Sequence, residues 1–230
     1  MMKQIPYGLT DFGRIQKENY YYVDKTMFIE KIEMQPSYLF LIRPDASGNI
    51  NEVEESFRMH CCGKLSDFVY RYEHLLGKNI WKVLDEKTKE EPGAFLSAIN
   101  TYATRKGDIK IYLLIDEYDN FTNTILSTYG MDLYRKAMHG EGYIRRFFNV
   151  IKAATTGMGS AVNRLFITGV SPVTMDDVTS GFNIGTNITN DPWFNDLVGF
   201  SEKELREMLA YYKEQGVLPM SIDDTVAMMK

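Results

Sequence analysis

The residues of this chain that suit phosphate chemistry stand at the ends of three short apolar runs. They are Arg43, Asp116, Glu117, Asp119, Thr168 and Ser171. Carboxylate oxygens suit a hydrated magnesium ion, which needs only one or two protein ligands. A hydroxyl can both donate and accept a hydrogen bond, which suits contact with a phosphate or a water molecule. If the three runs are parallel strands, these side chains meet at one edge of a sheet, and this convergence is the sharpest functional feature of the sequence.

The strongest single pattern is the run 113–117, in which Leu-Leu-Ile is followed by Asp116 and Glu117. It has the form of a Walker B segment. In such a segment Asp116 would face a hydrated Mg²⁺, and Glu117 would orient or deprotonate the water that attacks a phosphoryl group. Asp119 would add a contact behind them. An apolar strand closed by acids is also common without any site, so solvated strand-end acids are the alternative interpretation.

Other polar residues allow two interpretations each. Thr168 is suited to touch a γ-phosphate or the attacking water, or is a threonine that simply favours a strand. Arg145 and Arg146 match phosphate oxygens with paired donors, although exposed charge on a helix is the commoner use of such a pair. The run 60–62, His-Cys-Cys, has metal-ligating residue types. Neighbours on a helix point about 100° apart, however, and do not converge on one ion.

Regular elements must position these side chains, and the apolar patterns predict where they lie. Uninterrupted β-rich runs predict strands over 37–42, 109–115 and 164–170. Apolar residues three or four positions apart predict helices over 26–33, 51–76, 92–105 and 132–154, and a last helix that begins at Ser201 with a capping box to Glu204. Strand, helix and strand in this order predict a parallel sheet, and we expect Asp116 and Glu117 to emerge from its middle.

Composition and charge predict a folded protein with one large domain or one domain and an appendage. Apolar residues make up 44 % of the 230 residues and aromatic residues 13 %, enough for a sizeable core. No apolar run approaches the roughly 20 residues that cross a bilayer, and no secretory segment is visible, so we expect a cytoplasmic location. The two cysteines are adjacent, which excludes a disulfide framework. A net charge of −5 argues against a strong nucleic-acid binder, which would need a local basic patch.

With these residues assembled, the chain resembles the AAA-ATPase-like domain of a bacterial P-loop family whose longer members carry a PD-(D/E)xK nuclease-like domain. The resembling stretches follow the family order over nearly the whole chain and are 5–8, 11–12, 22–26, 40–44, 114–119, 166–172, 177–184 and 194–200. The resemblance implies an α/β fold, a three-layer P-loop NTPase-like domain with a mostly parallel sheet in residues 1–191. It also implies that residues 192–230 begin a helical lid.

The resemblance further implies that the chain binds ATP with Mg²⁺ and hydrolyses it, coupled to a conformational change or to an attached effector domain. In this interpretation Glu117 and Thr168 are catalytic, and Asp116 holds the metal. The nucleotide-binding residues would be Arg43, Asp116, Asp119 and Ser171. The alternative is a catalytically degenerate module of the same fold that recruits partners or regulates an effector.

One departure from the family pattern follows the first strand. There the family has a phosphate loop, whereas here Pro44 is followed by Asp-Ala-Ser-Gly-Asn, and no G-x-x-x-x-G-K-[ST] occurs in the sequence. Such a loop supplies backbone N–H groups and a lysine for the phosphates. Either the chain lacks the loop and keeps a degenerate scaffold, or a segment is missing between residues 44 and 45. We favour the missing segment, because the sheet otherwise loses the helix that covers one face beside its first strand.

Overall fold

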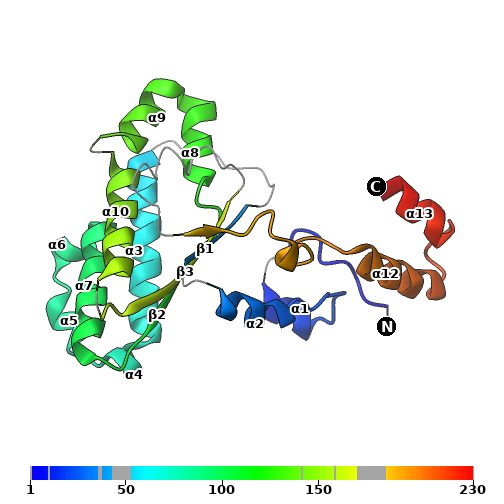
Figure 1. The fold of residues 1–230 in the computed structure, drawn as a ribbon, viewed down its shortest axis with the longest axis horizontal. Helices are drawn as coiled ribbons and strands as arrows, with labels where there is room; N and C mark the ends of the chain where they lie inside the picture. The colour runs from blue at the N-terminus through cyan, green and yellow to red at the C-terminus, as the bar shows by residue number, and fades with distance from the viewer. Residues whose placement is uncertain are drawn as a thin grey trace. The chain divides into compact units, whose positions relative to one another are not determined.

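The computed structural model of the protein forms two compact units, of residues Gln35–Thr189 and of Met1–Met34 with Asn190–Lys230 (Figure 1). The residues that the structure describes are 2–9, 11–35, 38–42, 53–140, 142–157, 159–169 and 185–229. The expected division places residues 1–191 in one core and 192–230 in a lid. In the structure Met1–Met34 form one compact unit with Asn190–Lys230, and the division into a core and a lid stays a prediction.

The larger unit contains a four-stranded parallel sheet in the order β2-β3-β1-β4. Its strands are β1 (Tyr38–Ile42), β2 (Ile111–Ile115), β3 (Val162–Gly169) and β4 (Thr186–Asn187). The mixed α/β class and the parallel sheet are therefore confirmed. The expectation that the acidic residues emerge from the middle of the sheet is wrong for the sheet that the described residues form. β3 inserts between β1 and β2, which leaves β2 at an edge.

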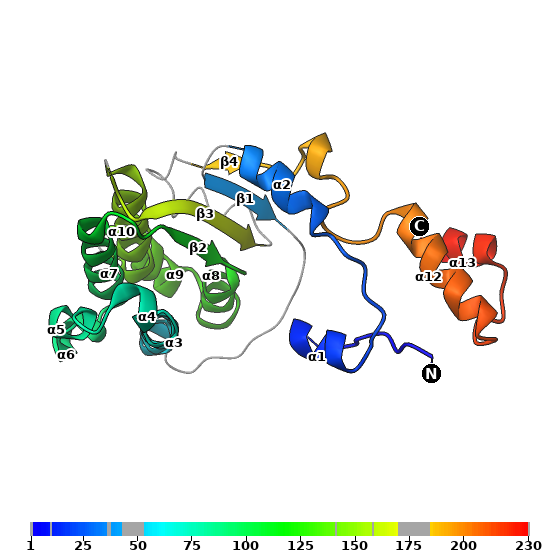
Figure 2. The ribbon, with the colours of Figure 1, turned by 90° about the horizontal axis from the view of Figure 1, so that it is seen from below.

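Helices of this unit form a layer against one face of the sheet (Figures 1 and 2). In chain order they are α3 (Val53–Arg71), α4 (Glu73–Leu76), α5 (Ile80–Val83), α6 (Glu86–Lys89), α7 (Pro92–Lys106), α8 (Asn120–Thr124), a π-helical turn (Ile125–Tyr129), α9 (Met131–Met138) and α10 (Tyr143–Thr156). Apolar residues of α3, α7 and α10 belong to the core clusters that also contain residues of β2 and β3.

The core lies between this helical layer and the sheet, in two clusters. Leu165 and Ile167 of β3 pack with Ile151 of α10 in the cluster nearer the carboxyl ends of the strands. A second cluster gathers where β2 and β3 begin, around Val162. The opposite face of the sheet is different, because Leu114 is 68 % exposed there. The three-layer arrangement therefore stays a prediction, while one sheet and one covering helical layer are established.

The predicted single helix over 132–154 is wrong. The structure forms two helices, with α9 ending at Met138 and α10 beginning at Tyr143. Gly140 has a φ of +57°, which favours glycine and ends a helix readily. A Cβ at Gly142 would overlap the carbonyl of Ala137 and lie 2.7 Å from the carbonyl oxygen of Lys136. Only glycine allows the chain to turn this closely against the end of α9.

The smaller unit joins the two ends of the chain. Its elements are α1 (Phe12–Lys17), α2 (Met27–Met34), a 3₁₀ turn (Pro192–Phe194), α12 (Glu202–Glu214) and α13 (Ile222–Met229). The capping box predicted for α12 is confirmed, since the Glu204 N–H donates to the Ser201 hydroxyl and the Ser201 N–H to the Glu204 carboxylate. Lys25 Nζ lies 2.6 Å from Glu204 Oε2, and Tyr21 packs on Tyr211 with ring centroids 5.7 Å apart. These contacts tie α12 to the N-terminal segment.

Within the described ranges, no helix has the length and apolar character needed to cross a membrane.

Candidate functional site

The carboxyl ends of β2 and β3 bring three of the predicted site residues together. The Thr168 hydroxyl donates a hydrogen bond to Asp116 Oδ1. The Glu117 N–H donates to the same hydroxyl oxygen at 3.2 Å, and the Tyr118 N–H donates to the Thr168 carbonyl at 3.0 Å. Parallel pairing of Ile115 with Ile167 makes this meeting possible, because each strand then ends at the same level. Asp116, Glu117 and Thr168 thus form one cluster, which we call the acidic edge.

Glu117 has a strained backbone. Its φ is +52°, in the left-handed region where a side chain costs roughly 1–2 kcal/mol. Only one other described residue apart from glycine, Asn19, has a positive φ. Strain of this kind persists where surrounding contacts fix the conformation, and it gathers at functional sites. At Glu117 the fixing contacts are the hydrogen bonds of residues 116–118 to Thr168.

Asp116 and Asp119 occupy opposite environments. Asp116 is exposed, whereas Asp119 has 0 % exposure. Asn123 Nδ2 donates to Asp119 Oδ2 at 3.1 Å, and the Thr122 hydroxyl donates to the Asp119 carbonyl at 2.7 Å. The Asp119 carboxylate therefore faces the protein interior at the start of α8, while the Asp116 carboxylate faces solvent and is available to a ligand.

The remaining predicted residues lie elsewhere. Arg43 and Ser171 are outside the described residues, as are residues 43–52, where the phosphate loop is expected. Arg146 is exposed on α10 and Arg145 is half-buried beside it. Cys61 packs against the core from α3, and burial raises the pKa of its thiol to about 12. These positions leave Asp116, Glu117 and Thr168 as the described part of the site.

Magnesium fits the acidic edge better than a metal held entirely by protein side chains. No group of three His, Cys, Asp or Glu able to hold an ion occurs in the part of the chain that the structure describes. Mg²⁺ retains most of its waters and accepts one or two carboxylate oxygens. Asp116 offers such a carboxylate, exposed and oriented by the Thr168 hydroxyl. The donor set therefore suits a hydrated Mg²⁺ bound through Asp116.

Sequence reasoning missed two residues that shape this edge. Tyr118 is 7 % exposed and belongs to the core cluster that contains Leu165 and Ile167. Gly169 follows Thr168 directly and touches the Tyr118 ring. The signal available in the sequence was a glycine at the end of a strand, a position that often marks close approach of another group.

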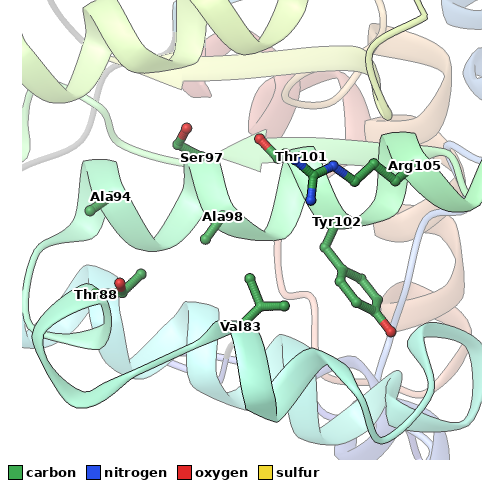
Figure 3. Close-up of a pocket in the computed structure, with 8 residues that line it drawn as sticks. All are labelled: Val83, Thr88, Ala94, Ser97, Ala98, Thr101, Tyr102 and Arg105. Carbon is green, nitrogen blue, oxygen red and sulfur yellow. The ribbon is translucent and has the colours of Figure 1, made fainter.

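A separate hollow of about 410 Å³ lies on the outer side of α7 (Figure 3). Ser97, Thr101 and Arg105 line it from α7, with Val83 and Thr88 from the neighbouring short helices. None of its lining residues belongs to the acidic edge. Most of its α7 side is formed by exposed residues, namely Ala94, Ser97, Thr101 and Arg105, so it offers a ligand little enclosure.

Comparison with known proteins gives one family. The family described as "Predicted AAA-ATPase" matches residues 6–49 and 45–179. The two matched segments overlap at 45–49, which is where the sequence departs from the family pattern. No solved structure matches the chain.

A curated relative from Azotobacter chroococcum mcd 1, described as "Uncharacterized protein in vnfD 5'region", is 24 % identical over 241 residues. The match covers 90 % of this chain and 45 % of the relative, so the chain spans less than half of that protein's length. An alignment of 241 residues is longer than the 230 of this chain, although it covers only part of it. The relative therefore has residues inside the matched region that this chain does not have.

Proposed function

Because the chain belongs to the predicted AAA-ATPase family, we propose that it binds Mg-ATP at the acidic edge and hydrolyses it slowly. One observation carries the proposal: Thr168 on β3 holds Asp116 and the Glu117 backbone from β2 in a single hydrogen-bonded cluster. In an open parallel sheet, ligands bind at this edge of the strands. Family membership is the reason for proposing ATP as the ligand. The cluster contains the kinds of group that phosphoryl transfer uses.

Each residue of the acidic edge has a distinct role in this proposal. Asp116 holds Mg²⁺, which when bound neutralises charge on the phosphates. Glu117 orients or deprotonates the attacking water, and its half-buried position limits where its carboxylate can move. Thr168 fixes the Asp116 carboxylate and contacts the γ-phosphate. Arg43 follows β1 directly in the sequence, and Ser171 stands two residues after the end of β3. In this proposal they complete the nucleotide site, with Asp119 supporting it from the interior.

A second function, a non-catalytic interaction module, is favoured by a different observation. The sequence has no phosphate loop, the family match breaks at 45–49, and the relative carries extra residues inside the matched region. Without the loop, ATP loses the backbone N–H groups and the lysine that hold its phosphates. The acidic edge would then be an inherited part of a fold that serves partners or an attached effector.

Thermal unfolding with ligands separates the two functions. In the presence of Mg-ATP at 100 times its Kd, the wild type should gain about 2.7 kcal/mol. Asp116→Asn should lose this gain, while Glu117→Gln should keep it and lose turnover by about 10² or more. Asp108→Asn, an exposed acid before the other end of β2, is the matched control and should behave as wild type. No shift with millimolar Mg-ATP would refute the ATPase and leave the interaction module.

A further inference from the structure

Gly169 makes room for residues 116–119, which we call the acidic turn. A Cβ added at Gly169 would overlap Cδ1 and Cε1 of the Tyr118 ring and would lie 2.9 Å from Asp119 Oδ1. Gly169 is not among the described glycines with a positive φ, so the requirement is for space and not for an unusual backbone. Any other residue here must push the Tyr118 ring or the Asp119 carboxylate away.

Tyr118 is anchored on both its side chain and its backbone. The ring is buried in the core cluster that Leu165 and Ile167 of β3 share, while the N–H donates to the Thr168 carbonyl at 3.0 Å. Tyr118 therefore contacts the end of β3 twice: its ring packs against Gly169, and its N–H donates to the Thr168 carbonyl. Because the core is close-packed, the ring cannot move without displacing its neighbours.

Glu117 lies between two residues whose positions are fixed by other contacts. Ile115 is paired with β3 in the sheet, and Tyr118 is anchored against Gly169. Only Asp116 and Glu117 span the interval, and Glu117 adopts a φ of +52° to do so. In this conformation its N–H reaches the Thr168 hydroxyl, which in turn donates to Asp116.

We propose that Gly169 and Tyr118 form a positioning lock. The absence of a side chain at Gly169 leaves space for the Tyr118 ring, and the fixed position of Tyr118 in turn orients Asp116 and Glu117 for a metal-bound ligand. The metal arm of this inference rests on the proposed function. Neither residue is catalytic in it, since both act through the acidic turn. The lock explains why a strained glutamate is kept at the end of β2: its neighbour is held by packing.

Gly169→Ala tests the lock, with Tyr118→Val as the second change of a double-mutant cycle. Valine has no atoms in the positions of Cδ1 and Cε1, so the double variant has space for the added Cβ. Gly63→Ala, where an added Cβ would meet nothing within 4 Å, is the matched control. Two readouts are needed: amide hydrogen exchange at Glu117 and Tyr118, and Mn²⁺ affinity measured by electron paramagnetic resonance without nucleotide.

In Gly169→Ala the two amides should exchange up to about tenfold faster than in wild type, as loss of a hydrogen bond allows, while amides in α10 stay protected. Mn²⁺ affinity should fall by about tenfold or more, the usual effect of losing an orienting contact behind a metal ligand. The double variant should be no worse than Tyr118→Val alone, because both changes abolish the same contact. Unchanged exchange in Gly169→Ala, or effects of the two changes that add in the double variant, would overturn the lock.

The exchange arm separates failure of the lock from failure of the proposed function. If wild type binds no Mn²⁺, the metal role of Asp116 fails, but amide exchange still decides whether Gly169 positions the turn. If Gly169→Ala does not fold, Tyr118→Val alone serves, because it removes the ring without adding an atom. In that variant the Glu117 amide should also exchange faster, and a protected Glu117 amide would refute the lock.

Discussion

Replacing Thr168 with valine removes one hydroxyl that takes part in two hydrogen bonds of the acidic edge. The hydroxyl accepts from the Glu117 N–H at 3.2 Å and donates to Asp116 Oδ1. Valine has nearly the same shape and also favours strands, so the pairing of β3 with its neighbours should persist. The change therefore isolates the hydroxyl.

The expected loss of stability depends on whether each hydrogen-bond partner of the Thr168 hydroxyl finds a replacement. Asp116 is exposed, so water replaces its lost bond at little cost. Glu117 is half-buried, and its N–H loses the Thr168 hydroxyl as acceptor; a hydrogen bond lost in such a position costs about 1–3 kcal/mol. Its left-handed backbone also loses one of the contacts that hold it. We expect Thr168→Val to lower the free energy of unfolding of the larger unit by about 1–2 kcal/mol.

Urea unfolding followed by tryptophan fluorescence measures this loss. The chain has two tryptophans, and in a Trp193→Phe background Trp81 reports on the larger unit, where its Nε1 donates to Glu73 at 2.9 Å. Thr156→Val is the control, because that hydroxyl is exposed and donates to a carbonyl of its own helix. The control should stay within about 0.5 kcal/mol. Equal effects of the two valines would refute the role of Thr168 in the acidic edge.

Three further predictions follow. At position 117, glycine should be more stable than alanine by about 1 kcal/mol, because only glycine tolerates a φ of +52° without strain; urea midpoints that favour alanine would contradict this. The hydrogen bond from Lys25 holds the pKa of Glu204 below its usual 4.5, so its stabilisation is complete above pH 4.5 and disappears as pH falls through the lowered pKa. Glu204→Gln should therefore destabilise α12 by about 1 kcal/mol at pH 7 and by less at pH 3, measured by amide exchange; a loss independent of pH would exclude the ion pair. In a Cys62→Ser background, iodoacetamide should modify Cys61, with its pKa of about 12, at least about 100-fold more slowly in the folded protein than in urea, and equal rates would show that the thiol is not buried.

Local patterns in the sequence were enough to find the strands that form the acidic edge. Uninterrupted apolar runs gave β1, β2 and β3 to within a few residues, because strands buried in a parallel sheet need apolar side chains on both faces. The capping box of α12 was equally visible, since it depends on two residues three positions apart. Features of this kind are local, because they are determined by residues that are close together in the sequence. A pattern search can therefore find them.

Features set by distant contacts were not accessible from the sequence. The break between α9 and α10 was signalled locally by Gly140 and Gly142, and only the close turn of Gly142 against Ala137 needed the structure. The order of strands is decided by packing of the whole sheet, which left β2 at an edge. The left-handed Glu117 follows from the seat of Tyr118 against Gly169, residues 51 positions apart in the chain, whereas local preference would put glycine at 117.

In the proposed function the acidic edge and the phosphate loop are separable parts of one nucleotide site, and this chain makes the separation testable. The contacts described for Asp116, Glu117 and Asp119 come from residues 116–169, and none of them needs the segment around residue 44. A chain without a phosphate loop can therefore still fold the acidic edge, and in the proposed function that edge holds a hydrated cation. Mn²⁺ binding without a response to Mg-ATP would mean that the carboxylate half of the site is kept and the phosphate half is lost, whereas a response to Mg-ATP would require phosphate donors outside residues 116–169.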